Sequence, residues 1–304
     1  MKKAIVIGSN GFVGSALIEV LIKNNIDVLA VSRNMSNEVQ LKTKNNNLFN
    51  FIILDQARIS ELPTLIQKLK WEVGPECVFY NFAWSGENRL MDGSIEIQLM
   101  NVSHLANSVK VASLLGCKKF INPGSIEESF AENYLSSKWG LGEFNSNNAY
   151  YAVSKIASKN MSKLMGYLYK IDYVHTRFSA ALDSKLTNGG YISRVFSKIL
   201  SGEINYDKSL NKNLFDLIDL DDLADAYYLI GLYGKNKSDY FIGSGNPQML
   251  EDYFENLIHY KTHRKMLPSK NYPNSNQFNS TLLLKDTGLN MATSFDKLIK
   301  KIIY

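Results

Sequence analysis

The first 178 residues of the chain alternate between short apolar segments and longer segments with helical periodicity. Short runs rich in β-branched and aromatic residues predict strands, and apolar residues three or four positions apart predict helices. Strands joined by helix-length crossovers form right-handed βαβ units, so the pattern predicts an α/β fold with a doubly wound parallel sheet covered on both faces. The predicted strands are Lys3–Gly8, Asp27–Ser32, Asn50–Asp55, Cys77–Ala83, Lys118–Asn122 and Tyr173–Phe178, and the predicted helices are Phe12–Lys23, Ile59–Lys70, Ile95–Leu115 and one that opens near Tyr151.

The alternation loosens after Phe178, where helical segments surround only short strands. This favours a smaller C-terminal lobe over the carboxyl edge of the sheet, where ligands bind in such folds. We expect a cofactor-binding domain at residues 1–178, to which residues 214–245 return, and a substrate-binding lobe at residues 179–213 and 246–304. The elements expected here are helices near Ile192–Leu200, Leu220–Leu232, Leu250–His259 and Ser294–Ile303 and strands near Leu217 and Tyr240.

Composition and charge narrow the class of protein further. Of the 304 residues 45% are hydrophobic, which is ordinary for a globular protein. No apolar run approaches the ~20 residues of a membrane span, and the first residues do not resemble a signal peptide. The net charge of +5 is too diffuse to indicate a nucleic-acid partner, and Cys77 and Cys117 are expected to be reduced core residues. We therefore expect a cytoplasmic protein with neither a membrane nor a nucleic acid as partner.

A glycine-rich turn joins the first predicted strand to the first predicted helix. Glycines at such a turn let the backbone approach a pyrophosphate closely, and the N–H groups at the start of the helix bind its charge. This position between an N-terminal strand and an amphipathic helix is typical of a Rossmann-type dinucleotide site. The predicted cofactor contacts in the turn are Gly8, Asn10, Gly11, Phe12, Val13 and Gly14.

The end of the second strand indicates which dinucleotide binds. An acidic residue there would bind the ribose 2′-hydroxyl of NAD. This chain has Ser32, Arg33 and Asn34 instead. A hydroxyl and a guanidinium suit the extra phosphate of NADP. We predict NADP as the cofactor, with NAD as the alternative in which Arg33 is a surface charge stacked on the adenine.

Tyr151 and Lys155 carry the predicted acid–base chemistry. Residues four apart share one face of a helix, so the phenol and the ammonium stand side by side. A free tyrosine has a pKa of ~10, and a neighbouring cation favours the phenolate and brings its proton into working range near neutral pH. The pairs Tyr134/Lys138 and Tyr233/Lys237 have the same spacing but adjoin glycine-containing segments, which are poor helix interiors. Only Tyr151 opens a long periodic segment.

Taken with further motifs, these features resemble the extended short-chain dehydrogenase/reductases, the NAD-dependent epimerase/dehydratase family of nucleotide-sugar enzymes. The similarity covers almost the full chain. It rests on the glycine turn, on the Tyr151/Lys155 pair, and on the segments Ile53-Leu54-Asp55, Asn81-Phe82-Ala83, Gln98-Leu99-Met100-Asn101-Val102, Phe120-Ile121-Asn122-Pro123-Gly124-Ser125, Asp219-Leu220-Asp221-Asp222-Leu223-Ala224 and Tyr240-Phe241-Ile242-Gly243-Ser244-Gly245.

The resemblance implies a role for each matching position. Ser125 would hydrogen-bond the reacting oxygen, and Tyr151 would be the acid and base. Lys155 would hold the nicotinamide ribose and lower the pKa of Tyr151. The other cofactor positions implied by the resemblance are Asp55 at the adenine amino group, Ala83 on the pyrophosphate path, Asn101 behind the site, and Gln56, Phe82, Trp84 and Phe178.

The chain departs from the family where substrate recognition is expected. Sugar dehydratases carry an Asp and a Glu after the catalytic hydroxyl, and here Ile126 and Glu127 follow Ser125, so dehydration is not expected. Ala180 and Phe215 stand where many relatives carry an Asn and an Arg that touch the nucleotide diphosphate. We expect other basic residues to contact the diphosphate instead; the alternative is that they are solvated surface charges. The candidates are Lys185, Arg194, Lys208 and Lys212.

Other side chains complete the expected site. Trp84 follows the fourth strand and would stack on a sugar or cover the nicotinamide; the alternative is a partly buried loop aromatic. His175 lies in a predicted buried strand and is expected to be a hydrogen-bonded core residue, and no histidine or cysteine spacing indicates a metal. The candidate substrate contacts are Trp84, Ser125, Ile126, Glu127 and Arg194.

The combined expectation is an NADP-dependent oxidoreductase that reduces the 4-keto group of a nucleotide-activated deoxysugar, in the synthesis of surface-polysaccharide precursors. One alternative is a nucleotide-sugar 4-epimerase with tightly bound NAD. A second alternative is a non-catalytic NADP-sensing protein. The family also implies a homodimer that packs the Tyr151 helix and the helix near Ile95–Leu115 as a four-helix bundle.

Overall fold

The chain divides into two compact units. The computed structural model describes residues 1–36, 46–86, 94–137, 149–203, 214–268, 270, 272, 276–289, 291 and 293–304. The first unit comprises Met1–Arg177 and Tyr227–Tyr240, and the second comprises Phe178–Ala226 and Phe241–Tyr304. The segment that returns to the first unit is thus shorter than the expected 214–245, because the strands near Leu214 and Leu217 pair inside the second unit.

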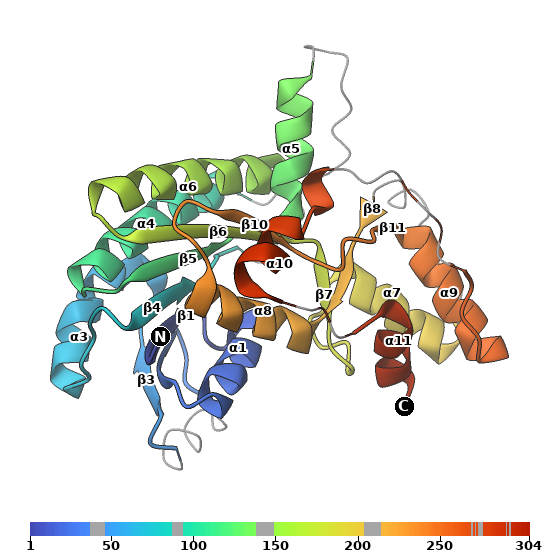
Figure 1. Cartoon of the computed structure of the whole chain (residues 1–304), viewed down its shortest axis with the longest axis horizontal. Helices are drawn as coiled ribbons and strands as arrows, with labels where there is room; N and C mark the ends of the chain where they lie inside the picture. The colour runs from blue at the N-terminus through green and yellow to red at the C-terminus, as the bar shows by residue number, and fades with distance from the viewer. Residues whose placement is uncertain are drawn as a thin grey trace. The chain divides into compact units, whose positions relative to one another are not determined.

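A seven-stranded sheet in the order β10-β6-β5-β4-β1-β2-β3 is the centre of the first unit (Figure 1). Each of the five neighbouring pairs from β6 to β3 is parallel. The order from β3 to β6 is that of a Rossmann sheet, which confirms the predicted fold class. The strands are β1 (Lys3–Ile7), β2 (Asp27–Ser32), β3 (Phe49–Ile53), β4 (Cys77–Asn81), β5 (Lys119–Pro123), β6 (Asp172–Phe178) and β10 (Asp239–Ile242).

Helices cover both faces of this sheet, because alternate residues of each buried strand supply two cores. On β1, Ile5 and Ile7 belong to one apolar cluster with residues of α3 and α4. Ala4 and Val6 point to the opposite face and are fully buried, as is Leu17 of α1. The helices are α1 (Phe12–Lys23), α3 (Leu62–Leu69), α4 (Ile95–Leu114), α5 (Ile126–Ser136) and α6 (Ala149–Leu168), with the 3₁₀ helix η1 (Gln56–Glu61); α8 (Leu220–Tyr233) ends in this unit.

The second unit has its own core and two small sheets. Its apolar cluster includes Phe196, Phe254 and Leu298, which come from three helices. The ion pair from Lys301 to Asp219 ties the last helix to one of the small sheets. The elements are β7 (Ala180–Leu182) parallel to β9 (Leu217–Asp219), β8 (Leu214–Phe215) antiparallel to β11 (Gln248–Met249), α7 (Tyr191–Ser201), α9 (Leu250–His263), η3 (Asn276–Phe278), α10 (Thr281–Thr287) and α11 (Phe295–Ile303).

Within the first unit, the clearest differences from the sequence-based elements are the following. The predicted helix Ile59–Lys70 is split into η1 and α3, since Pro63 in the first turn of α3 has no N–H to continue a helix through it. The strand predicted to reach Ala83 ends at Asn81. Helix α5 was not predicted, although Ser125 and Glu128 have the spacing of a capping box.

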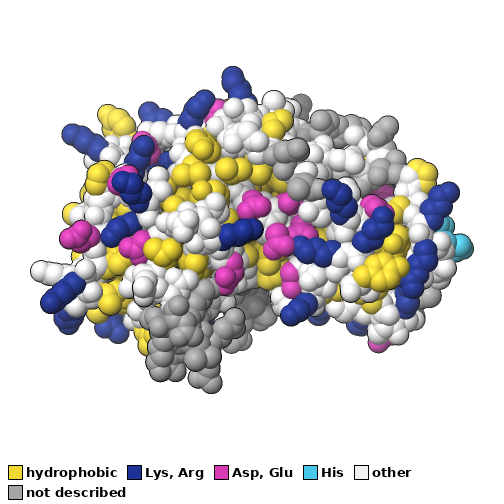
Figure 2. Space-filling model, turned by 60° about the horizontal axis from the view of Figure 1, so that its bottom comes forward, with side chains coloured by type: hydrophobic (Ala, Val, Ile, Leu, Met, Phe, Trp, Pro, Cys, Tyr) yellow, Lys and Arg dark blue, Asp and Glu magenta, His cyan; other side chains and the backbone are white. Residues whose placement is uncertain are grey.

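In the described parts of the chain, none of the helices is both long and apolar enough to cross a membrane. Figure 2 shows Lys and Arg side chains interspersed with Asp and Glu on the face that it presents.

Candidate active site

The turn between β1 and α1 brings its backbone directly against the end of β4. Gly8 has φ of +77°, which favours glycine, and a Cβ there would lie 2.7 Å from the backbone N of Ala83. A Cβ on Gly14 would lie 2.5 Å from the carbonyl oxygen of Gly8. Gly11 is the N-cap of α1, and among the described residues no side chain caps this helix. The first turn of α1 therefore keeps N–H groups for an anion, which fits a dinucleotide pyrophosphate.

The residues predicted to select the cofactor lie at the carboxyl end of β2, and two further predicted cofactor contacts, Asp55 and Gln56, follow β3. Ser32 is half-buried at the end of β2, and Arg33 is exposed directly after it. The side-chain amide of Asn10 donates to the carbonyl oxygen of Asn34 at 2.7 Å, which ties the glycine turn to this segment. Asp55 caps η1 by accepting a hydrogen bond from the backbone N of Ala57 at 2.8 Å. Gln56 is buried and donates to the hydroxyl of Ser108 at 3.5 Å.

Tyr151 and Lys155 lie one turn apart on α6, and both are buried, with 7% and 6% of their surface exposed. The Nζ of Lys155 donates to the carbonyl oxygen of Pro123 at 3.0 Å, so α6 is fastened to the carboxyl end of β5. That oxygen lies two residues before Ser125. The helical spacing inferred from the sequence therefore brings Tyr151, Lys155 and the end of β5 together.

Trp84 packs against both of these side chains. The Lys155 Nζ lies 3.8 Å from the centre of the Trp84 ring, and the Trp84 and Tyr151 rings meet edge to face at 5.9 Å. The indole N–H of Trp84 donates to the buried side chain of Gln98 at 2.8 Å, a contact that was not predicted. The side chain of Asn101 accepts from the backbone N of Ser85 and donates to its carbonyl oxygen, which anchors the segment after β4 to α4.

Ser125 is the N-cap residue of α5. Its hydroxyl oxygen accepts a hydrogen bond from the backbone N of Glu127 at 3.3 Å. Its own backbone N donates to the Glu128 carboxylate at 2.9 Å, which completes a capping box. Ile126 is buried in the core. The sequence argument singled out Glu127, whereas the residue bonded to the backbone of Ser125 is Glu128.

Glu128 is fully buried, and its neighbours favour the charged form of its carboxyl group. Burial by itself raises the pKa of this carboxyl. The His175 ring, whose Nε2 lies 2.8 Å away, and the ammonium groups of Lys155 and Lys159 lower it, and the net shift of the Glu128 pKa is downward. His175 is buried and hydrogen-bonded, as the sequence predicted. The site therefore holds a buried carboxylate next to Ser125 as well as the Tyr151/Lys155 pair.

The predicted substrate contacts Lys185 and Arg194 belong to the second unit. Arg194 on α7 is exposed and its guanidinium donates to the carbonyl oxygen of Gly189 at 2.5 Å. Lys185 is also exposed, and Phe178 is half-buried at the end of β6. Lys208 and Lys212 lie outside the described residues.

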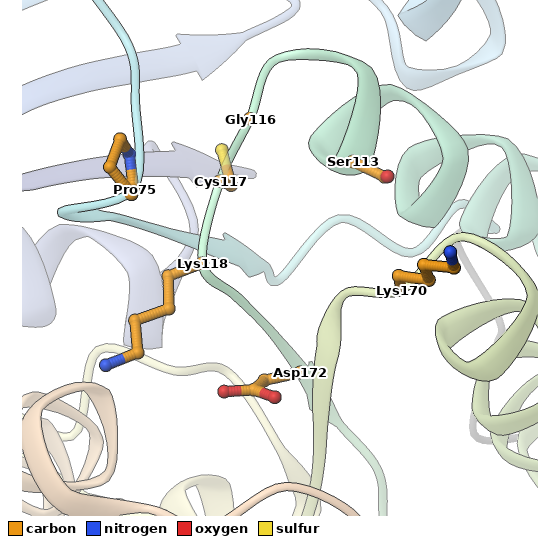
Figure 3. A pocket seen from close by; sticks show the side chains of 7 residues that line it. All are labelled: Pro75, Ser113, Gly116, Cys117, Lys118, Lys170 and Asp172. Atoms are coloured by element: carbon orange, nitrogen blue, oxygen red, sulfur yellow. The ribbon is translucent and has the colours of Figure 1, made fainter.

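A hollow of ≈ 570 Å³ lies at the opposite edge of the sheet, where β5 and β6 begin (Figure 3). It contains none of the predicted site residues, which gather at the carboxyl ends of the strands. Cys117, one of two free and buried cysteines, borders it. The lining residues are Pro75, Ser113, Gly116, Cys117, Lys118, Lys170 and Asp172.

Comparison with known families fits this geometry. The model of the NAD-dependent epimerase/dehydratase family matches residues 4–243. The chain belongs to the NAD-dependent epimerase/dehydratase family. The family resemblance inferred from the sequence motifs is therefore confirmed. The chain is a member of an enzyme family and has a Rossmann-type sheet.

Solved structures of this family share the fold over the whole chain. The Bordetella bronchiseptica enzyme WbmH in complex with NAD⁺ has a TM-score of 0.71 at 18% identity and covers 100% of this chain and 97% of its own. A UDP-glucuronic acid 4-epimerase variant from Bacillus cereus has a TM-score of 0.73 at 16% identity, with 99% and 98% covered. The UDP-glucose 4-epimerase from Thermotoga maritima has a TM-score of 0.69 at 16% identity, with 99% and 97% covered. At these identities the likeness shows the fold.

Proposed function

We propose that this member of the epimerase/dehydratase family is an oxidoreductase that reduces the 4-keto group of a nucleotide-activated deoxysugar. The observation that carries the proposal is the shared burial of Tyr151 and Lys155 at the carboxyl end of β5, where the Lys155 ammonium bonds Pro123 and Ser125 opens α5. A phenol, an ammonium and a hydroxyl are the groups that such a reaction needs from the protein.

Each of these side chains has a defined task in the proposed reaction. When bound, the nicotinamide supplies the hydride that reaches the carbonyl carbon. The Tyr151 hydroxyl gives its proton to the carbonyl oxygen as that oxygen becomes an alcohol, and the Lys155 charge stabilises the phenolate left behind. The Ser125 hydroxyl donates a hydrogen bond to the same oxygen and stabilises its developing negative charge.

The proposed substrate class rests on the relatives and on the site. The similar Thermotoga maritima structure holds UDP-glucose, and the Bacillus cereus one holds UDP-4-deoxy-4-fluoro-glucuronic acid and NAD. Dehydration is not proposed, because buried Ile126 has no proton to donate where dehydratases carry an Asp. The expected product is a precursor of a surface polysaccharide.

We propose NADP as the preferred form of the cofactor. Arg33 is exposed at the end of β2, beside half-buried Ser32, where its guanidinium is accessible to a phosphate. The similar structures carry NAD, so NAD is the alternative.

The second candidate is a 4-epimerase with tightly bound NAD. It is favoured by the similarity to UDP-glucose and UDP-glucuronic acid 4-epimerases. The same Tyr151, Lys155 and Ser125 would act twice, first in an oxidation and then in a reduction from the other face of the sugar.

One assay separates these candidates. The purified protein is incubated with NADPH or NADH and a panel of 4-keto and 4-hydroxy sugar nucleotides. A reductase consumes the reduced cofactor stoichiometrically with a 4-keto sugar. An epimerase interconverts 4-hydroxy sugars without net cofactor consumption. Binding of NADP without either reaction would instead support the non-catalytic sensing protein.

We also propose that the protein is a homodimer. The solvent face of α6 has an apolar stripe with spacings of three and four residues, the spacing of helices that pack on helices. Helix α4 lies beside α6 (Figure 1). Leu99 and Met100 of α4 are also exposed. The residues of the α6 stripe are Tyr150, Val153, Ala157, Met161, Leu164 and Leu168.

A further inference from the structure

A buried chain of hydrogen bonds runs behind Ser125 and is not used by the proposed chemistry. It begins at the Glu128 carboxylate, which accepts from the backbone N of Ser125 through Oε1. Its other oxygen, Oε2, lies 2.8 Å from Nε2 of His175 on β6. Both oxygens of a fully buried carboxylate are thus fixed by partners on different elements.

The His175 ring is held on its far side as well. Its Nδ1 lies 3.2 Å from the side-chain amide nitrogen of Asn122 and 3.4 Å from the hydroxyl of Tyr173. An amide nitrogen only donates, so Nδ1 is the acceptor and the ring proton lies on Nε2, where it reaches Glu128. Asn122 on β5 and Tyr173 on β6 therefore fix the orientation of the His175 ring, and this ring in turn fixes the position of the Glu128 carboxylate.

The backbone at Gly124, directly before Ser125, is tightly packed against the side chains of Glu128 and His175. A Cβ on Gly124 would lie 2.5 Å from Nε2 of His175 and closer still to Oε1 of Glu128. The backbone N of Gly124 also donates to the carbonyl oxygen of Thr176 at 2.6 Å. Any shift of the Glu128/His175 pair is therefore passed on to the backbone next to Ser125.

The helix that carries the proposed acid–base pair is fastened to the same carboxylate. Tyr151, Lys155 and Lys159 follow at intervals of four and so share one face of α6. The Lys159 Nζ lies 3.9 Å from Oε2 of Glu128 and also forms an ion pair with Glu132, one turn further along α5. The face of α6 that presents Tyr151 thus binds the first two turns of α5.

Capping alone does not account for this arrangement. An exposed Glu or Gln at the same position would close the capping box without the cost of burying a charge. The Ser125 hydroxyl uses a lone pair to accept from the backbone of Glu127, which leaves its hydrogen as a donor. The direction of that hydrogen depends on the first turn of α5.

We propose that Glu128 and His175 are positioning residues that fix the Ser125 hydroxyl relative to Tyr151. This inference rests on the proposed function, in which that hydroxyl donates to the reacting oxygen. It assigns the pair no contact with substrate or cofactor.

A double-mutant cycle tests the proposal. Glu128→Gln keeps the shape and an acceptor for the Ser125 backbone but puts an amide opposite His175. Losing an oxyanion donor costs about 10²–10³ in kcat, so a misdirected donor should lower kcat about tenfold, with KM unchanged within about threefold. In a Ser125→Ala background, Glu128→Gln should cost nothing further, because the group that it positions is gone. The same tenfold loss in both backgrounds would overturn the proposal.

Matched variants separate positioning from stability. Glu132→Gln removes a carboxylate from the same helix and the same lysine without touching Ser125, and it should leave kcat within about twofold. His175→Gln retains an amide that donates to Glu128 and should recover much of the kcat that His175→Leu loses. Equal losses in His175→Gln and His175→Leu would contradict the hydrogen-bonded role of the ring.

A measurement without turnover keeps this inference distinct from the proposed function. Amide hydrogen exchange at Ser125, followed by NMR in the full chain, should accelerate at least tenfold in Glu128→Gln and not in Glu132→Gln. Unchanged exchange in Glu128→Gln would refute the positioning role. If no sugar nucleotide is turned over by the wild type, the proposed function fails, and the exchange result still decides whether the pair holds Ser125.

Discussion

At the scale of single residues, the chemistry available to each side chain of the site depends on the groups that surround it. Tyrosine is a weak acid in water, and here it is buried beside Lys155, whose ammonium lies between the Trp84 ring and the Pro123 carbonyl. Lys155 is thus directed by two contacts from other elements. These contacts place the Lys155 ammonium 5.7 Å from the centre of the Tyr151 ring.

Tyr151→Phe should abolish the proposed turnover while leaving the cofactor site intact. The variant loses one hydroxyl and keeps the ring that packs on Trp84. General acid–base catalysis contributes about 10²–10⁴-fold, so kcat should fall by that factor and NADPH affinity should change only a few-fold. Steady-state kinetics and fluorescence titration with NADPH measure both. Activity like that of the wild type would remove Tyr151 from the mechanism.

Arg33→Ala should weaken NADPH far more than NADH. A hydrogen bond to a charged group contributes roughly 1.5–3 kcal/mol, so the dissociation constant for NADPH should rise about ten- to a hundredfold. Titrations with the two cofactors, on the variant and the wild type, give the ratio. Equal losses for both cofactors would contradict a contact with the 2′-phosphate and favour the NAD-dependent alternative.

At the scale of elements, buried polar side chains join strands to helices that lie far along the chain. Lys119 on β5 is buried, and its Nζ donates to the carbonyl oxygens of Ile230 and Gly231 at 3.0 Å each, near the end of α8. A cation near a helix C-terminus is stabilised by the negative end of the helix dipole. Burial nevertheless disfavours the ammonium and lowers the pKa of Lys119 to about 8.

Lys119→Met should remove a pH dependence of stability. The pKa of Lys119 is about 8 in the folded chain against an ordinary 10.5. Between these values the unfolded chain binds a proton that the folded chain has released, so the free energy of unfolding of the wild type rises with pH. The variant lacks this rise, and its stability relative to the wild type should fall from pH 8 to pH 10.

Urea unfolding at the two pH values measures this difference. Lys68→Met, at an exposed position of α3, is the matched control and should follow the wild type. Tyrosines with raised pKa values, such as Tyr227, are common to all three proteins and cancel in the comparison. If the free energy of unfolding changes with pH in the same way for the wild type and for Lys119→Met, burial of the Lys119 ammonium does not lower its pKa.

At the scale of the whole molecule, the exposed apolar stripe of α6 is the feature that a monomer leaves unexplained. Half or more of the surface of Val153, Leu164 and Leu168 is exposed, although the same helix buries Tyr151 and Lys155 on its other side. Burying apolar surface between two copies releases about 25 cal/mol per Å². A dimer through α6 would thus also hold the helix that carries the proposed acid–base pair.

Leu164→Glu should convert the proposed dimer into a monomer. The side chain is 56% exposed and lies within the α6 stripe, so a charge there would be buried at a helix–helix interface. Sedimentation velocity at micromolar concentration measures the change. Leu69→Glu, at an exposed position of α3, is the control and should leave the association state unchanged. A monomeric wild type would contradict the proposal.

The parts of the fold that could be predicted are those that depend on local periodicity in the sequence. The bounds of α1 and β2 match the predicted Phe12–Lys23 and Asp27–Ser32, since apolar spacing and flanking turn residues are local signals. The same holds for Tyr151 and Lys155, whose common face follows from helical spacing. The capping box that starts α5 was also visible in the sequence as Ser125 and Glu128, three residues apart.

The sequence by itself determined the strand–helix order, the glycine turn and the family, because each depends on residues close together in the chain. Only the tertiary structure decided which carboxylate stands behind Ser125, since Glu128 and His175 are 47 residues apart. It likewise decided the partner of Lys119, which lies 111 residues away on α8. A buried charge takes its partner from whichever element packs against it, and that choice is made by the fold as a whole.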